Sequence, residues 1–124
     1  MSEREILSNK GFEETVETLQ RSAEANGLKI VSVVDAQANL RKIGINIGGN
    51  KILEVFSPVL AKEVFDHDLR AGIIPPLRIY IYEDGGRTHV MAQDAIYLFS
   101  PYRGLKDLAS RVDMMIEAVL KSVM

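Results

Sequence analysis

Residues 77–92 read LRIYIYEDGGRTHVMA and carry the pattern that decides the fold. Apolar and polar side chains alternate from Leu77 to Tyr82, which is the period of a β-strand with one buried face. The triplet Asp84-Gly85-Gly86 then predicts a hairpin turn. A two-residue loop places Ile79 and Ile81 opposite the apolar set Thr88, Val90 and Ala92. A three-residue loop shifts the register by one residue and exchanges that set for Arg87, His89 and Met91. We expect the two-residue loop.

The remaining elements are read outward from this hairpin. Helical spacing of apolar residues predicts three longer helices, whereas runs of β-branched and apolar residues predict two more strands. The expected order is a helix over 11–27, a strand over 28–34, a short helix over 36–43, a strand over 51–56, a helix over 57–72, the hairpin, and a final helix over 105–123. In the helix over 57–72 the expected buried stripe is Val59, Leu60, Val64, Phe65 and Leu69. Residues 95–103 are either a continuation of the strand or an aromatic loop.

The order α-β-α-β-α-β-β-α predicts one domain of the α/β or α+β class over residues 1–124. Two strand-helix-strand units favour right-handed parallel crossovers, and the hairpin adds an antiparallel edge. We therefore expect a four-stranded mixed sheet with the helices mainly on one face. The other face of the hairpin carries Tyr80, Tyr82, His89 and Met91. A second copy of the chain is the simplest cover for such a face, so we expect a homodimer.

Composition excludes several classes of function. The 124 residues are 47% hydrophobic and include no cysteine, which excludes thiol nucleophiles, disulfides and cysteine-based metal sites. The 15 Lys and Arg against 17 Asp and Glu give a net charge of −2, so we expect neither a nucleic-acid partner nor a membrane partner. The charged, acidic start of the chain and the short apolar runs indicate a cytoplasmic protein. No motif calls for a cofactor.

Glu54 and His89 are the candidate catalytic residues. Glu54 lies in an otherwise apolar strand, where a half-buried carboxyl group has a raised pKa and suits general acid or base work. The alternative is an edge residue that reaches solvent or pairs with an arginine such as Arg78. His89 shares its face with aromatic residues, but no acidic residue is placed to orient it. We therefore interpret the face that carries His89 as an interface patch rather than a catalytic site.

Other polar residues point to ligand binding or to ordinary caps. Asp35, at the end of a strand, is a candidate ligand residue and also a typical helix N-cap. Ser57 is similarly a cap, with Pro58 at the first helical position. We expect any ligand crevice at the strand ends near these three residues, with Tyr80 and Tyr82 as further binding candidates. The sequence Asp66-His67-Asp68 indicates a solvated helix face, and no spacing predicts a metal site.

Two further segments have a weak functional signal. The stretch 44–50, GINIGGN, lacks the phosphate-loop pattern and leads into a strand, which favours a turn. Tyr97, Phe99 and Tyr102 with Arg103 are able to stack a planar ligand, but no basic groove is evident around them. Packing of this segment against the last helix is the expected arrangement.

Several stretches resemble the family known as domain of unknown function 302. They are Phe12-Glu13-Glu14-Thr15 through Gly27, Val33-Val34-Asp35, Ala38 to Gly44, Ile52 to Pro58, and Pro76 to Glu83. The chain departs from the family pattern at two polar places. It has Ala36 where the family has a histidine, and Phe56-Ser57-Pro58 where the family reads Gly-Asn-Pro. The resemblance implies a small α/β fold and a homodimer, but no established reaction.

These observations lead to three functional hypotheses. The preferred one is a homodimeric binding or accessory module with a small-molecule ligand. The alternative is a small enzyme that uses Glu54 or His89 as general acid or base. The second alternative is an adaptor for protein partners.

Overall fold

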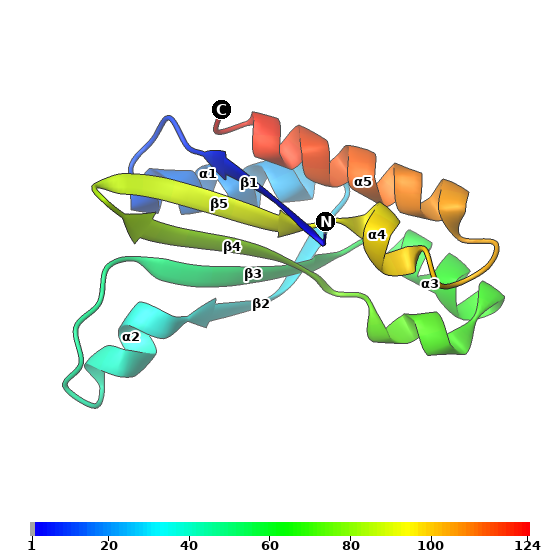
Figure 1. The fold of residues 1–124 in the computed structure, drawn as a ribbon, viewed down its shortest axis with the longest axis horizontal. Coiled ribbons are helices and arrows are strands. Elements are labelled where there is room, and N and C mark those ends of the chain that lie inside the picture. Colours follow the sequence, from blue (N-terminus) through cyan, green and yellow to red (C-terminus); the bar gives the residue numbers. More distant parts are fainter. Residues whose placement is uncertain (1) are drawn as a thin grey trace.

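The computed structural model describes residues 2–124 and shows an α+β fold (Figure 1). The strands are β1 (Glu3–Leu7), β2 (Lys29–Asp35), β3 (Asn50–Phe56), β4 (Leu77–Asp84) and β5 (Arg87–Gln93). The helices are α1 (Phe12–Ala25), α2 (Ala36–Arg41), α3 (Pro58–His67), α4 (Ala95–Phe99) and α5 (Lys106–Lys121), with a 3₁₀ segment at Leu69–Ile73.

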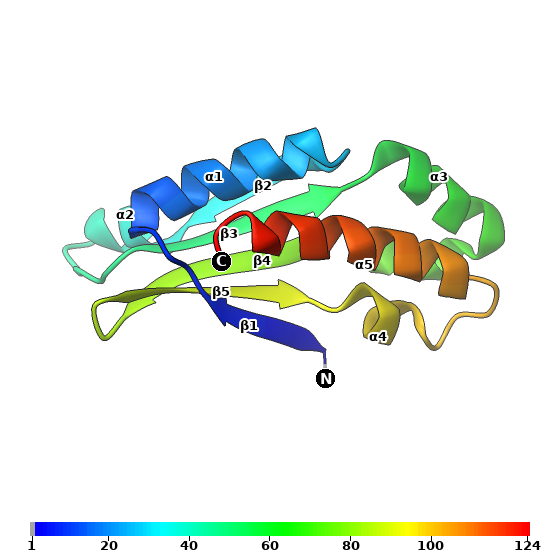
Figure 2. The same ribbon diagram turned by 90° about the horizontal axis from the view of Figure 1, so that it is seen from above.

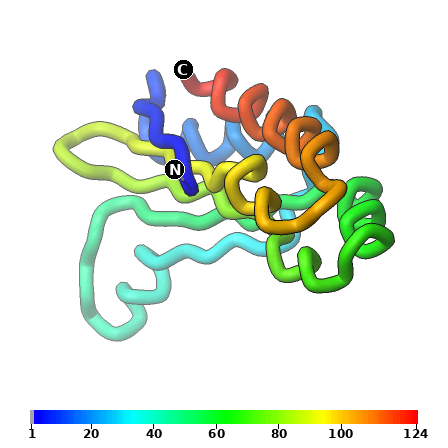
Figure 3. Tube along the Cα trace, turned by 45° about the vertical axis from the view of Figure 1, so that its right-hand side comes forward, coloured from blue at the N-terminus to red at the C-terminus, as the bar shows by residue number. Residues whose placement is uncertain are grey.

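Within residues 2–124 the strands form one five-stranded sheet in the order β1-β5-β4-β3-β2, and every neighbouring pair is antiparallel. The expectation of a four-stranded mixed sheet was therefore wrong. A parallel crossover needs a helix that packs a buried stripe onto the sheet. The helix α2 has no buried residue, and α2 and α3 lie at opposite ends of the sheet (Figure 3). Each following strand therefore begins at the end of the sheet where the previous strand finished, and it runs antiparallel to that strand.

The strand that the sequence did not reveal is β1. It pairs antiparallel with β5, with Glu3 opposite Gln93 and Leu7 opposite His89. Its side chain Arg4 points toward α5, where its Nη1 lies 2.5 Å from Glu117 Oε2 and its Nη2 lies 3.0 Å from Asp113 Oδ1. Arg4, on the core side of β1, interrupts the alternation of apolar and polar residues that marks a strand. Its acidic partners lie more than 100 residues further along the chain, so nothing near β1 in the sequence explains a charge at this position.

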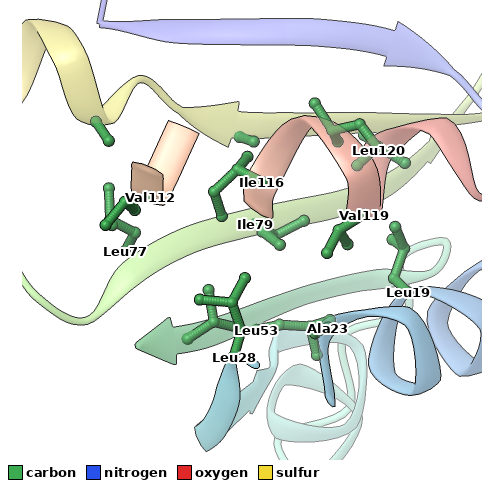
Figure 4. Packing of buried hydrophobic residues seen from close by; sticks show 14 of the residues in the cluster. Leu19, Ala23, Leu28, Leu53, Leu77, Ile79, Val112, Ile116, Val119 and Leu120 are labelled. Carbon is green, nitrogen blue, oxygen red and sulfur yellow. The ribbon is translucent and has the colours of Figure 1, made fainter. Parts of the chain in front are cut away.

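The core lies between the sheet and the two long helices. Figure 2 shows α1 and α5 side by side on the same face of the sheet. Figure 4 shows how Leu19 and Ala23 of α1 and Ile116 of α5 meet Leu53 and Ile79 of the sheet. All five are at most 1% exposed. The buried hydrophobic side chains form one continuous cluster.

The hairpin has the expected register. Ile79 lies opposite Ala92, Ile81 opposite Val90, and Glu83 opposite Thr88. The two loop residues, Gly85 and Gly86, have φ angles of 61° and 75°. These values are typical of a two-residue turn whose twist matches that of the strands, and they explain why glycine occupies both positions.

Two helical segments differ from expectation. The helix expected over 57–72 ends at His67, and Leu69, 78% exposed, begins the 3₁₀ segment. In α3 the buried residues are Leu60, Ala61 and Val64, whereas Val59 and Phe65 are 74% and 44% exposed. The expected stripe was too wide, because α3 lies beyond the end of the sheet and buries only a narrow face. Residues 95–99 form the short helix α4 rather than a strand or loop. Asp94 caps it, accepting a hydrogen bond from the Tyr97 N–H at 3.1 Å.

No helix among residues 2–124 lies across the centre of the sheet face opposite α1 and α5 (Figures 1 and 2). In the same part of the chain, no helix combines the length and the apolar composition needed to cross a bilayer.

Candidate functional site

The face of the sheet opposite α1 and α5 is called the open face below. Its side chains follow from the register, because residues directly opposite one another in a sheet point to the same side. Tyr80 lies opposite Met91 and Ile52, Tyr82 lies opposite His89, and Glu54 lies opposite Arg78. The edge strand β1 adds Glu3 and Glu5 to this face. The open face thus includes Glu3, Glu5, Leu7, Ser32, Val34, Asn50, Ile52, Glu54, Arg78, Tyr80, Tyr82, His89, Met91 and Gln93.

Three rings stack on the open face. The ring centroids of Tyr80 and Tyr82 are 5.0 Å apart, and those of Tyr82 and His89 are 4.7 Å apart, with interplanar angles of 23° and 12°. The two tyrosines are neighbours along one face of β4, whereas His89 faces Tyr82 from β5. All three side chains are half-buried. The sequence hypothesis placed these residues on one face, and the structure brings them into contact.

Glu5 holds one end of this stack. The Tyr82 hydroxyl donates a hydrogen bond to the Glu5 carboxylate, which is also 3.5 Å from His89 Nδ1. The hydrogen bond to the ionised carboxylate raises the pKa of Tyr82 to about 12, with a smaller contribution from burial. Glu5 could not be placed near His89 from the sequence, because it comes from strand β1, which the sequence did not reveal.

The other end of the stack is also fixed. The Asn50 Nδ2 donates a hydrogen bond to the Tyr80 hydroxyl at 2.7 Å. Because the Tyr80 oxygen accepts this bond, its own proton remains available to an acceptor outside the protein. Asn50 is a second residue that sequence analysis missed, since it was assigned to a turn rather than to β3.

A shallow groove of about 180 Å³ lies on the open face next to Tyr80. Ile52, Tyr80 and Met91 supply apolar surface, while charged and polar residues stand at its rim: Glu3, Arg78 and Gln93. Arg78 Nε lies 3.9 Å from Glu54 Oε2, and the Glu54 side chain is 24% exposed. Glu54 therefore has the arginine partner that the sequence offered as the alternative to a catalytic role.

Asp35 and Ser57 cap helices, as expected. Asp35 Oδ1 accepts a hydrogen bond from the Ala38 N–H at 2.9 Å, and Ser57 Oγ accepts one from the Leu60 N–H at 3.4 Å. Asp35 ends β2, whereas Ser57 follows β3, which runs in the opposite direction. Asp35 and Ser57, together with Pro58, therefore lie at opposite ends of the sheet. They do not line one crevice.

Among residues 2–124, no group of three or more histidine, cysteine, aspartate or glutamate side chains is arranged to hold a metal ion. His67 is exposed, and its Nδ1 lies 3.1 Å from the Glu63 carbonyl oxygen. In the turn before β3, the Gly49 N–H donates to Glu83 Oε1 at 2.6 Å. This contact ties the glycine-rich segment to the end of β4.

Comparison with known proteins gives one family and one fold. The family model described as "Domain of unknown function DUF302" matches residues 4–123. No curated protein matches the chain. Among solved structures, the chain is similar to an uncharacterized conserved protein DUF302 from Bacillus stearothermophilus, with a TM-score of 0.90 and 23% identity. The match covers 100% of this chain and 99% of that one, and at this identity it shows the fold alone.

Proposed function

We propose that this chain, which belongs to the DUF302 family, is a cytoplasmic binding module that works as a homodimer and binds through the open face of its sheet. The observation that carries the proposal is the stack of Tyr80, Tyr82 and His89 on a sheet face whose centre no helix of residues 2–124 covers. Tyrosine and methionine are typical of interfaces, because they bury a large apolar surface and keep a polar atom for a partner.

A second copy of the chain is the partner that this face fits best. Half-buried apolar side chains, Ile52, Tyr80 and Met91, occupy its centre, and charged groups of both signs stand around them, including Glu3 and Arg78. Such a face is self-complementary when a two-fold axis turns the acidic edge of one copy toward the arginine of the other. Burial of the apolar centre then supplies the free energy of association.

A small ligand fits the groove beside Tyr80. Its apolar surface and charged rim are typical of sites that bind a molecule by its apolar body and orient it by a few polar contacts. The Tyr80 hydroxyl has a proton to donate, because its oxygen already accepts from Asn50. In this proposal the ligand lies at the seam between two copies.

The test is a comparison of Tyr80→Asp with Tyr97→Asp by native mass spectrometry. Tyr97 is 54% exposed on α4, so Tyr97→Asp is a control for adding a charge at a tyrosine outside the open face. We expect the wild type and Tyr97→Asp to be dimers and Tyr80→Asp to be a folded monomer by circular dichroism. A monomeric wild type, or a Tyr80→Asp dimer, would contradict the proposal. A folded wild-type monomer would instead favour the adaptor hypothesis.

The enzyme hypothesis gains one observation, the contact of Glu5 with His89. At 3.5 Å from His89 Nδ1, the negative charge of the Glu5 carboxylate favours the tautomer with its proton on Nδ1. The Nε2 of that tautomer carries a lone pair, and this is the form that serves as general base. The test is to measure the tautomer of His89 by ¹⁵N NMR in the wild type and in Glu5→Gln. A general base held by Glu5 requires the Nδ1–H tautomer in the wild type and a mixture in the variant. The same mixture in both proteins would remove the support for this hypothesis.

A further inference from the structure

We propose that a hollow between α4 and the start of α5 is a second binding site, which takes a small anionic molecule with an apolar ring. The hollow is separate from the open face, because it is lined by α4, the segment that follows α4 and the start of α5. These elements lie beyond the ends of the strands (Figure 1). The residues that line this hollow are therefore different from those of the open face.

The shape of the hollow suits a small ring. Its volume is about 320 Å³, which lies at the lower end of the range for small-molecule sites. Phe99 and Ala109 supply a rigid apolar base, since they are 2% and 1% exposed and packed into the core. Ile96 is 45% exposed and Tyr102 is half-buried, so both retain surface for a ligand. Burial of a ring against these four side chains is favourable.

The charge of the hollow selects an anion. Arg103 and Lys106 are exposed on its lining, and no acidic residue of the described chain lines it. The nearest carboxylates along the chain are already engaged. Asp94 Oδ1 accepts a hydrogen bond from the Tyr97 N–H at 3.1 Å, and Asp107 Oδ2 pairs with Arg111 Nε at 3.2 Å. The positive charge of Arg103 and Lys106 is therefore available to a ligand.

Arg103 and Lys106 supply complementary chemistry. The arginine guanidinium has a planar fork of donors that matches a carboxylate or phosphate, whereas the lysine ammonium acts as a point charge. Tyr102, next to Arg103 in the chain, adds an aromatic ring to the same lining. The chemistry shared by the fitting ligands is thus a ring that bears a carboxylate or a phosphate monoester.

The sequence offered two interpretations of the aromatic segment, packing against the last helix or stacking of a planar ligand. The structure shows the packing, since Phe99 belongs to the core and Tyr102 packs against it. Phe99, Tyr102 and Arg103 also line the hollow, where a planar ligand would stack. The basic surroundings that the sequence did not reveal come from Lys106, which the first turn of α5 brings beside Arg103.

The experiment is an NMR titration of the full chain at low ionic strength with four probes. Benzoate and phenyl phosphate combine a ring with an anion, benzyl alcohol has the ring alone, and inorganic phosphate has the anion alone. We expect saturable shifts of the Gly104, Lys106 and Ala109 amides with the first two probes. Benzyl alcohol and inorganic phosphate are expected to bind at least about tenfold more weakly, because each lacks one half of the recognition.

The variant Arg103→Gln/Lys106→Gln tests the role of the charges. We expect its affinity for benzoate to fall at least about tenfold, with an unchanged circular dichroism spectrum. Lys121→Gln is the matched control, because it removes a cation from the far end of α5 and should bind as the wild type does. Equal affinity of the double variant and the wild type, or no saturable shift at the three amides, would overturn the proposal. Shifts confined to the Tyr80 and Met91 amides would assign the probe to the open face instead.

Discussion

The contact between Gly49 and Phe12 yields a sharp prediction for Gly49→Ala. Gly49 is buried, and an added Cβ would lie 2.5 Å from Phe12 Cγ and 2.6 Å from both Cδ atoms. Non-bonded carbon atoms do not approach this closely, so a neighbouring group must shift. Phe12 is 7% exposed and begins α1, so its ring moves only if the helix or the turn moves. The glycine is thus required by close packing rather than by an unusual backbone angle.

The magnitude follows from two opposing effects. Overpacking of a close-packed core costs about 1–3 kcal/mol, and the loss of glycine freedom in the unfolded chain returns about 0.4–1 kcal/mol. We expect Gly49→Ala to lower the free energy of unfolding by about 1–2 kcal/mol. At Gly48 an added Cβ meets Glu83 Cβ at 3.5 Å, which is ordinary contact. Gly48→Ala should therefore be neutral or slightly stabilising.

The assay is urea unfolding followed by circular dichroism, with free energies from linear extrapolation. Phe12→Leu gives a double-mutant cycle, because a smaller side chain at residue 12 should remove most of the penalty of Gly49→Ala. Equal stabilities of the Gly48 and Gly49 variants would refute the packing argument. So would a Gly49→Ala penalty that is unchanged in the Phe12→Leu background.

Three further predictions concern the open face, the caps and the hairpin. A phenol absorbance titration should show one tyrosine, Tyr82, with a pKa of about 12, which falls toward 10 in Glu5→Gln. Because the folded-state pKa is the higher one, the stability from this hydrogen bond is complete below pH 10 and is lost as the pH rises toward 12; a flat difference in stability between the two proteins over this window would disprove it. Ser57→Ala and Asp35→Ala should each lower the free energy of unfolding by about 1 kcal/mol in urea unfolding, and neither change should alter the binding of a ligand at the open face. Gly86→Ala should cost about 1–2 kcal/mol, because φ is 75° there, and an unaffected urea midpoint would argue against the turn geometry.

The hairpin could be predicted from the sequence, since its information is local. Alternation over Leu77–Tyr82 assigns the faces, and two glycines assign the loop. The caps Asp35 and Ser57 were equally accessible, because each acts on a backbone group three residues away. Strand direction was not local in this sense. The direction of β3 relative to β2 depended on whether α2 packs across the sheet. The signal was that residues 36–41 form no stripe that could be buried against it.

Only the part of the candidate site that depends on local sequence could be predicted. Tyr80, Tyr82 and His89 share a face by alternation alone, so their proximity followed once the loop length was chosen. Glu5 lies 84 residues from His89 along the chain, and only the pairing of β1 with β5 joins them. A core-facing Arg4 concealed that pairing, because its carboxylate partners are on α5. Charge matching between a short charged strand and a late helix is the signal that remained unused.

The position of β1 also sets the order in which the strands can pair while the chain is being synthesised. The strands β2, β3, β4 and β5 each neighbour the next along the chain, so successive pairs are able to form as the chain emerges. β1 leaves the ribosome first, yet its partner β5 and the acidic residues that hold Arg4 follow some 80 to 115 positions later. Until β5 has been made, residues 3–7 have no strand to pair with. Until β1 then joins it, the free edge of β5 is open to any extended peptide. The first strand made is thus the last to join the sheet, and its arrival completes both the sheet edge and the histidine–glutamate contact.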